Sequence, residues 1–197
     1  PISILAQRFG NPGRRIWYMC QGQDPEKLQP NVPAPKSIGH GKVVPPNTRN
    51  ADMLLTYLLH MSEKVAARLR RHHLRSRIFF VGLRTSGGWI GGKLRCALPT
   101  DDSREIMQLC RTLMQQAWHG EGIHQVQVTA LEPVTTGSQL ELFTATSTEQ
   151  HEVNTVMDAV NRRYGELSLA PARLLNRSSM PDVIAPAWKP FGHRKTV

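Results

Sequence analysis

Strand-like and helix-like segments follow one another between residues 36 and 131 in an order that few folds accommodate. Four segments with strand character and two with helical periodicity are arranged as strand, helix, strand, strand, helix, strand. The second and third strands are joined by the tight turn Ser86-Gly87-Gly88, so they must be antiparallel neighbours. This order predicts an α+β fold, a ferredoxin-like sheet of split β-α-β units with two helices on one face. We expect the strands at residues 36–45, 76–84, 89–97 and 123–131.

Both predicted helices have an apolar stripe that can pack on the sheet. The first follows the capping candidates Asn47, Thr48 and Asn50, and the second opens with Asp102 and Glu105 in the spacing of a capping box. The stripe of the first helix is Leu54, Leu58, Met61, Val65 and Leu69, that of the second is Ile106, Leu109, Cys110, Leu113, Met114 and Ala117, and the far side of the first carries Lys64, Arg68, Arg70, Arg71 and Arg75.

Period-2 alternation in the third and fourth strands indicates that the sheet face away from the helices is polar and basic. A solvated face is the ordinary reason for such a pattern. However, the chain has 25 Lys+Arg against 15 Asp+Glu and a formal net charge of +10, which is typical of a polyanion binder. We therefore interpret this face as a platform that grips nucleic-acid phosphates and not base edges. Its residues are Trp89, Lys93 and Arg95 in the third strand and Gln125, Gln127 and Thr129 in the fourth, whereas Ile90, Leu94, Cys96 and Leu98 point inward.

The first 24 residues form a separate helical segment. Their apolar positions fit two short helices interrupted by Gly10-Asn11-Pro12-Gly13, which favours a turn. Such a hairpin can present backbone N–H groups to a phosphate, with Arg14 and Arg15 beside it, although a simple packing unit has the same pattern. Residues 25–35 are proline-rich and indicate an extended linker. Because Pro1 lies in the middle of a helical pattern, we expect a piece of a longer protein.

The pentapeptide Gln139-Leu140-Glu141-Leu142-Phe143 places large apolar side chains where no helix or strand is predicted. It resembles the short peptide by which bacterial polymerases and repair proteins dock on the sliding clamp. In that interpretation Leu140, Leu142 and Phe143 fill a pocket and Gln139 hydrogen-bonds at its rim. Burying the three side chains is worth roughly 5–9 kcal/mol, and after the cost of ordering the peptide the affinity is on the order of micromolar. The alternative is that these residues end a strand and pack on the chain's own core.

The order of these features resembles the C-terminal half of a bacterial Y-family translesion DNA polymerase of the polymerase IV and polymerase V type. The sharpest local matches are Arg8-Phe9-Gly10 in the helical hairpin and Lys36-Ser37-Ile38-Gly39 at the start of the sheet domain. The resemblance covers residues 1–143. It implies the thumb end at residues 1–24, the linker at 25–35, the little finger at 36–134, a clamp-binding peptide at 135–143 and a C-terminal extension at 144–197.

In that family the little finger lies along sequence-independent double-stranded DNA and the thumb holds the minor-groove side. The resemblance therefore implies that the outward face of the sheet contacts DNA, together with Lys36, Ser37, His40 and Lys42 near the start of the first strand. It also implies a bacterial protein of DNA damage tolerance and the SOS response, cytoplasmic and associated with the nucleoid.

The chemistry of the family requires palm-domain carboxylates that hold Mg²⁺. The only adjacent carboxylate pair here, Asp101-Asp102, begins a helix, where capping explains it. We expect this chain to be non-catalytic and without cofactor or metal, with nucleotidyl transfer and Mg²⁺ in a palm domain that it lacks. The alternative function is a non-catalytic adaptor of a mutagenic repair complex with the same architecture. A third is a general RNA-binding domain, against which the predicted sheet lacks paired central aromatics.

Residues 144–197 go beyond the simplest polymerase IV layout. They contain one predicted helix, ended by Gly165, and then basic residues interleaved with prolines, which predict an extended basic arm. Packing on the little finger, DNA binding and recruitment of other repair proteins are all open for this part. The helix is predicted from Val153, Val156, Met157, Val160 and Tyr164.

The remaining signals exclude other classes of protein. Cys20, Cys96 and Cys110 are odd in number and lack metal-site spacing, so we interpret them as reduced, mostly packing thiols. The sequence has no stretch long and apolar enough to span a membrane and no secretion signal. We therefore expect no membrane partner.

Overall fold

The computed structural model describes residues 1–24, 34–135 and 147–179. The chain divides into two units, Pro1–Ala34 and Pro35–Val197. Among the described residues, no helix has the length and apolar character needed to cross a lipid bilayer.

The first unit contains α1 (Ile2–Cys20), two helical segments joined at a kink. Gly10 has φ 63° and ψ −142°, which is not helical, and Pro12 follows two residues later. A Cβ atom at Gly13 would overlap the carbonyl oxygen of Leu5, so the second segment packs closely on the first. The predicted break at Gly10-Asn11-Pro12-Gly13 is confirmed.

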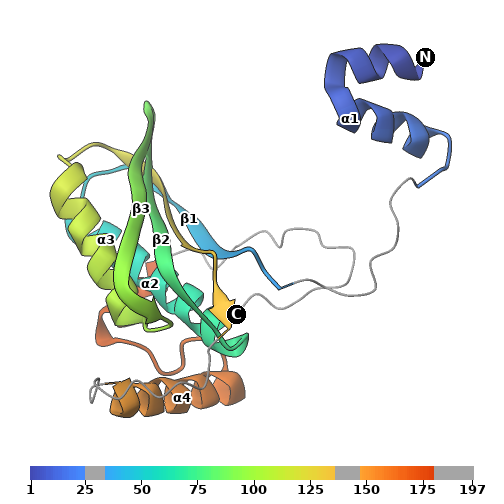
Figure 1. Cartoon of the computed structure of the whole chain (residues 1–197). Helices are drawn as coiled ribbons and strands as arrows, with labels where there is room; N and C mark the ends of the chain where they lie inside the picture. Colours follow the sequence, from blue (N-terminus) through green and yellow to red (C-terminus); the bar gives the residue numbers. More distant parts are fainter. Residues whose placement is uncertain (25–33, 136–146, 180–197) are drawn as a thin grey trace. The chain divides into compact units, whose positions relative to one another are not determined.

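The second unit is built on an antiparallel sheet with the strand order β1-β4-β2-β3 (Figure 1). The α+β class is confirmed, and so are the split β-α-β units, because β4 lies between β1 and β2, and β2 lies between β3 and β4. The second and fourth strands occupy the centre, whereas in a ferredoxin sheet the first and third do. The strands are β1 (Ser37–Thr48), β2 (Leu74–Thr85), β3 (Gly88–Thr100), β4 (Ile123–Leu131) and the short β5 (Val134–Thr135), which pairs with the start of β2.

Two helices, α2 (Ala51–Arg71) and α3 (Ser103–Ala117), cover one face of this sheet and leave the other face open (Figure 1). Asn50 caps α2 by accepting the Met53 N–H at 3.0 Å, and Asp102 caps α3 by accepting the Arg104 N–H at 2.9 Å. The predicted stripe of α2 is fully buried. The centre of the core is Leu54, Leu58, Met61, Val65 and Leu69 of α2, Phe79, Val81 and Leu83 of β2, and Val126, Val128 and Ala130 of β4.

Two strand predictions are wrong in detail. The strand β1 continues through Pro45-Pro46 to Thr48, because β1 is an edge strand where proline need not donate a ladder hydrogen bond. Leu98 is 47% exposed and does not point inward. The pairing of β2 with β3 slips between Ser76 and Ile78, so residues around Leu98 leave the regular alternation.

Residues 147–179, called the extension below, form α4 (Ser147–Tyr164) and the 3-10 helix η1 (Ala172–Ser179), and η1 packs on α2. The helix prediction is confirmed. The predicted extended arm is wrong up to residue 179, because Leu174 folds back into a buried position, 2% exposed; residues 180–197 lie outside the described residues. Three of the five apolar positions that predicted α4, Val153, Val156 and Tyr164, are more than half exposed, whereas Met157 and Val160 are half-buried.

Candidate nucleic-acid interface

The open face of the sheet carries rows of residues that run across the four long strands. Strand pairing fixes each row, because directly opposite residues in an antiparallel sheet point to the same face. The predicted outward positions in β3 and β4 are confirmed by this register. In the order β1, β4, β2, β3, the rows are Ser37, Leu131, Ile78 and Arg95; Gly39, Thr129, Phe80 and Lys93; Gly41, Gln127, Gly82 and Gly91; and Val43, Gln125, Arg84 and Trp89.

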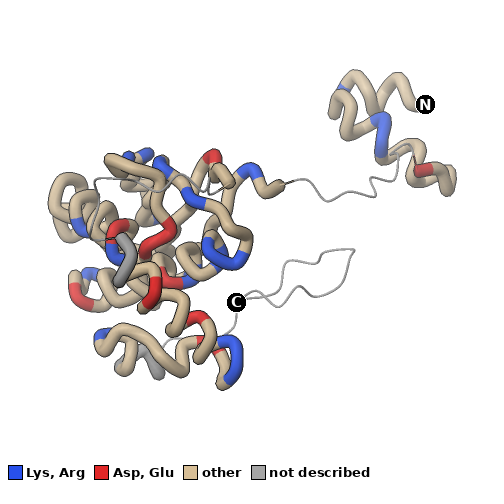
Figure 2. Tube along the Cα trace, turned by 60° about the horizontal axis from the view of Figure 1, so that its bottom comes forward, with Lys and Arg blue, Asp and Glu red and all other residues tan. Residues whose placement is uncertain are grey.

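The charge of the open face is entirely positive. Arg84, Lys93 and Arg95 are exposed on it, and the sequences of β1 to β4 contain no Asp or Glu. Figure 2 shows where Lys and Arg, and where Asp and Glu, occur along the chain trace. The described carboxylates of this unit belong instead to helices and connecting segments. Because no anionic side chain on these strands neutralises the cations, the face is suited to a polyanion.

Neutral hydrogen-bonding groups lie beside these cations on the central strand β4. Gln125, Gln127 and Thr129 are half-buried, and the Gln127 Nε2 donates to Thr129 Oγ1 at 3.1 Å. Amide and hydroxyl groups of this kind supply positioning contacts to phosphate oxygens. Lys36 and Ser37 are exposed at the start of β1, where they extend the same face.

The prediction that His40 and Lys42 join this face is wrong. Ser37 points outward, so the alternation of β1 turns His40 and Lys42 toward the helices, where they are only 9% and 7% exposed. Burial, and then the nearby cations Lys64, Arg68 and Lys42, lower the pKa of His40 from 6.5 to about 4. The sequence interpretation grouped the polar residues at the start of this strand without considering that successive side chains alternate between the two faces of the sheet.

The buried His40 predicts a specific dependence of stability on pH. Its pKa is lowered in the folded state, so between pH 6.5 and about 4 the unfolded chain binds more protons and acidification favours unfolding. Acidification over this range should lower the free energy of unfolding of the wild type by up to about 3 kcal/mol more than that of His40→Gln. Urea unfolding at pH 7.5 and pH 4.5 measures the difference.

The control for this prediction is His151→Gln, at an exposed position of α4. Glu63, whose pKa is raised mainly by burial, changes the pH profile in the opposite direction, but equally in all three proteins. Parallel pH profiles for wild type and His40→Gln would show that His40 is solvated and not buried among cations.

Sequence reasoning missed Phe80 and Arg84 on the open face. Residues 76–84 were predicted to form a strand, but its two faces were not assigned. The alternation places Phe80 and Arg84 outward beside Trp89. The Phe80 and Trp89 rings meet edge to face with centroids 6.4 Å apart, and the Arg84 Cζ lies 5.7 Å from the Trp89 ring centroid. The alternation of side chains along β2 is the signal that could have identified both residues.

Two other predicted contact sites belong to other parts of the chain. Arg14 and Arg15 are exposed in α1, which belongs to the first unit. Gln139, Leu140, Leu142 and Phe143 lie outside the described residues.

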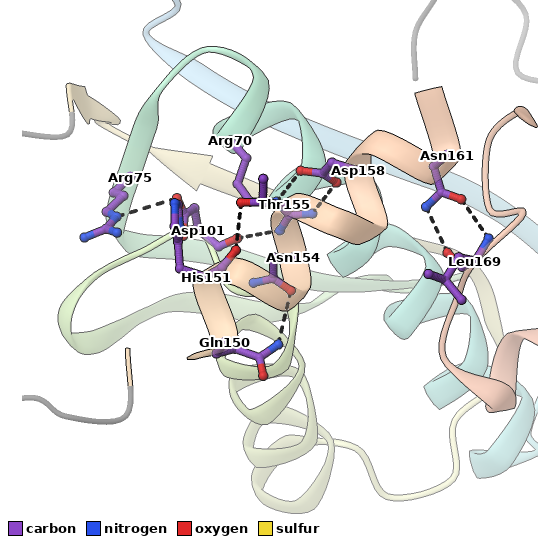
Figure 3. Close-up of polar contacts among 10 residues, drawn as sticks. All are labelled: Arg70, Arg75, Asp101, Gln150, His151, Asn154, Thr155, Asp158, Asn161 and Leu169. Atoms are coloured by element: carbon purple, nitrogen blue, oxygen red, sulfur yellow. Dashed lines mark hydrogen bonds and ion pairs between the residues drawn. The ribbon is translucent and has the colours of Figure 1, made fainter. Parts of the chain in front are cut away.

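The helix side of the domain is occupied by the extension (Figure 3). Arg70 of α2 binds both carboxylate oxygens of Asp158, at 2.6 and 2.8 Å, and donates to the Asp101 carbonyl at 2.9 Å. Lys64 pairs with Glu166 at 2.7 Å, and Arg173 with Asp52 at 2.8 Å. Several cations of α2 therefore have partners within the chain, which leaves the open face as the better candidate for a nucleic acid.

Other residue classes show no reactive arrangement. Burial raises the pKa of Cys96 to about 11 and of Cys110 to about 12, so both thiols stay protonated near neutral pH, as expected for packing residues. Cys20 is exposed and is not one of the packing thiols. Within residues 1–24, 34–135 and 147–179, no three His, Cys, Asp or Glu residues gather as metal ligands would.

The sequence matches a known protein family over its sheet domain. Residues 35–142 match the model of the impB/mucB/samB family C-terminal domain. Among curated proteins, the chain is 25% identical over 178 residues to the putative UV-damage repair protein UvrX of Bacillus subtilis. It is 26% identical over 178 residues to DNA polymerase IV 2 of Halalkalibacterium halodurans. Each alignment covers 87% of this chain and 43% of the relative, so the chain spans less than half the length of these relatives.

A solved complex of the beta-clamp processivity factor and the little finger domain of PolIV contains a chain that aligns with this structure. The alignment has a TM-score of 0.43 and 11% sequence identity, and it covers 56% of this chain and 98% of the other.

Proposed function

The chain belongs to the impB/mucB/samB family and carries its C-terminal domain at residues 35–142, and we propose that this domain holds DNA against the open face of its sheet. The prediction of the C-terminal half of a Y-family polymerase is confirmed by this family and by the DNA polymerase IV relatives. The proposed ligand is double-stranded primer-template DNA, bound without sequence preference. In this proposal the protein holds and positions the DNA during translesion synthesis and repair.

The observation that supports this proposal is the open face with cations and no carboxylates. Arg84, Lys93 and Arg95 lie on two adjacent strands, within one continuous surface that the helices do not cover. Lys and Arg contacts to phosphates release counterions and give affinity that does not depend on sequence. The glutamine and threonine side chains of β4 add hydrogen bonds to the backbone of the duplex.

We also propose that Gln139, Leu140, Leu142 and Phe143 dock this protein on a bacterial sliding clamp. The support is their sequence pattern, and their position directly after the sheet domain. A micromolar peptide contact and a weak phosphate grip reinforce each other when they act on one assembly, because the second contact forms at high effective concentration.

Nucleotidyl transfer and its Mg²⁺ belong, in this proposal, to other parts of the full-length protein. The carboxylate pair Asp101-Asp102 is already engaged, since Asp101 pairs with Arg75 at 3.5 Å and Asp102 caps α3. This pair does not fit a Mg²⁺ site, which needs carboxylates directed at a shared ion.

The DNA proposal is tested by the salt dependence of binding. Replacing Lys93 and Arg95 together with alanine removes two phosphate contacts, so the slope of log affinity against log salt should become less steep by at most about 2 units. Fluorescence anisotropy of a labelled duplex between 50 and 200 mM salt, about the range over which such contacts weaken strongly, measures the slope.

The matched control replaces Arg71 and Arg111, two exposed arginines of α2 and α3, with alanine. This double variant has the same net charge but an unchanged open face. A slope that changes more in the control than in the Lys93, Arg95 variant would place the DNA on the helix side and contradict the proposal.

A further inference from the structure

We propose that Trp89, Phe80 and Arg84 form a stacking site for an unpaired base of single-stranded DNA at the β2–β3 end of the open face. This inference rests on the proposed DNA-holding function and adds to it a second mode of contact. Phosphate contacts by Lys93 and Arg95 ignore the bases, whereas a stacking site recognises a base that has left the duplex.

The aromatic residues of this site form one cluster by strand pairing. Trp89 of β3 faces Arg84 of β2, and Phe80 lies two rows along the same strand. Trp89 remains 42% exposed although it contacts both neighbours. A large aromatic ring is thus available to solvent on a face that also carries the cations Lys93 and Arg95 and the exposed aliphatic side chain of Val43.

Gly82 lets both rings lie against the backbone of the sheet. A Cβ atom at Gly82 would lie 2.8 Å from Phe80 Cε1 and 2.9 Å from Trp89 Cε3, closer than such contacts allow. The row that contains Gly82 also has glycine at Gly41 and Gly91. Gly82 itself is covered by the rings, but its neighbour Gly91 is exposed and has no side chain, so a nucleotide backbone can approach the sheet closely beside the rings.

The position of Arg84 indicates what kind of group fits the Trp89 ring. Its guanidinium, a planar cation, lies 5.7 Å from the ring centroid. A nucleobase is also planar and stacks on tryptophan, while the displaced arginine is within reach of the phosphate of the same nucleotide. Bases in a duplex already stack on their neighbours, so the occupant is single-stranded.

The alternative is that the cluster only stabilises the β2–β3 hairpin. Cross-strand aromatic pairs and cation–π contacts do stabilise sheets. The two explanations differ in one measurable property, because only a stacking site distinguishes a strand with bases from a strand with the same phosphates and no bases.

The experiment compares an oligothymidylate with an abasic oligonucleotide of the same length, using the full chain and fluorescence anisotropy at one salt concentration. We expect wild type to bind the oligothymidylate about 5- to 150-fold more tightly, the range for one stacked base. Trp89→Leu, which keeps apolar bulk over Gly82, should bring this ratio close to one, and Trp89→Phe should keep most of it. Neither variant should change binding of the abasic strand.

The outcomes separate this inference from the proposed function. Equal affinities of wild type for both strands, with steep salt dependence, would overturn the stacking site and leave the phosphate grip intact. A ratio that Trp89→Leu leaves unchanged would also overturn it, provided that the melting temperature shows the variant to be folded. Trp89→Leu weakening the abasic strand and a duplex as much as the oligothymidylate would assign Trp89 to the general surface instead. Failure of wild type to bind any of these nucleic acids at low salt would overturn both proposals.

Discussion

Replacing Leu142 and Phe143 together with alanine is expected to abolish binding to a bacterial sliding clamp while leaving the melting temperature nearly unchanged. In the proposed contact the two side chains fill the pocket of the clamp, so their loss removes most of the apolar surface that the peptide buries. Starting from affinity on the order of micromolar, a loss of several kcal/mol moves binding beyond about millimolar. Surface plasmon resonance on immobilised clamp and thermal unfolding of the same protein samples measure both quantities.

The control is Glu141→Ala, which changes the middle of the same pentapeptide without removing an apolar anchor. Truncating two core side chains would cost several kcal/mol, whereas truncating two residues of an exposed docking peptide should cost less than about 1 kcal/mol. An early-melting double variant therefore means that the pentapeptide packs on its own domain. A stable double variant that still binds the clamp means that docking uses other residues.

The second large effect is expected at Arg70, which joins the extension to the sheet domain. Arg70→Met should lower the free energy of unfolding by about 3–5 kcal/mol, the usual cost of removing one partner of a buried ion pair. The Arg70 side chain is only 6% exposed, and its loss leaves Asp158, the Asp101 carbonyl and the nearby buried Glu63 without their cationic partner. Urea unfolding monitored by circular dichroism gives the free energy.

Two variants make the Arg70 result interpretable. Arg104→Met breaks an ion pair whose arginine is 63% exposed, so it should cost less than about 1 kcal/mol. Combining Arg70→Met with Asp158→Leu should recover part of the loss, because no unpaired charge then remains at Asp158. If Arg70→Met is as mild as Arg104→Met, the extension does not depend on this contact for its position.

Local sequence patterns predicted the helices, the strands and most of the core, because the residues with regular apolar spacing are also the ones that pack in the core. The stripe from Leu54 to Leu69 on α2 has the helical period and is buried as predicted. Trp89, Lys93 and Arg95 were placed on the open face because one strand with clear alternation is sufficient for that inference. The family followed from short motifs that flank these elements.

Long-range contacts decided the features that the sequence did not predict. Arg70 was assigned to the far side of a helix, and its partner Asp158 lies 88 residues later, beyond the range of any local pattern. The burial of Leu174 likewise depends on α2, which precedes it by about a hundred residues. In contrast, strand alternation was sufficient to predict the orientation of His40, Lys42 and Phe80, but the sequence analysis misplaced the first two and missed the third.

The docked extension limits how far from the sheet domain the proposed clamp contact can lie. Residue 135 is paired to β2, and α4, held through Asp158, starts at residue 147, so the chain between them is tethered at both ends. Eleven residues (136 through 146) reach at most about 40 Å when fully extended. A peptide near their midpoint therefore stays within about 20 Å of the line that joins the two attachment points. In the proposed contact, the clamp is therefore kept close to the sheet domain, because the chain is attached to this domain on both sides of the peptide.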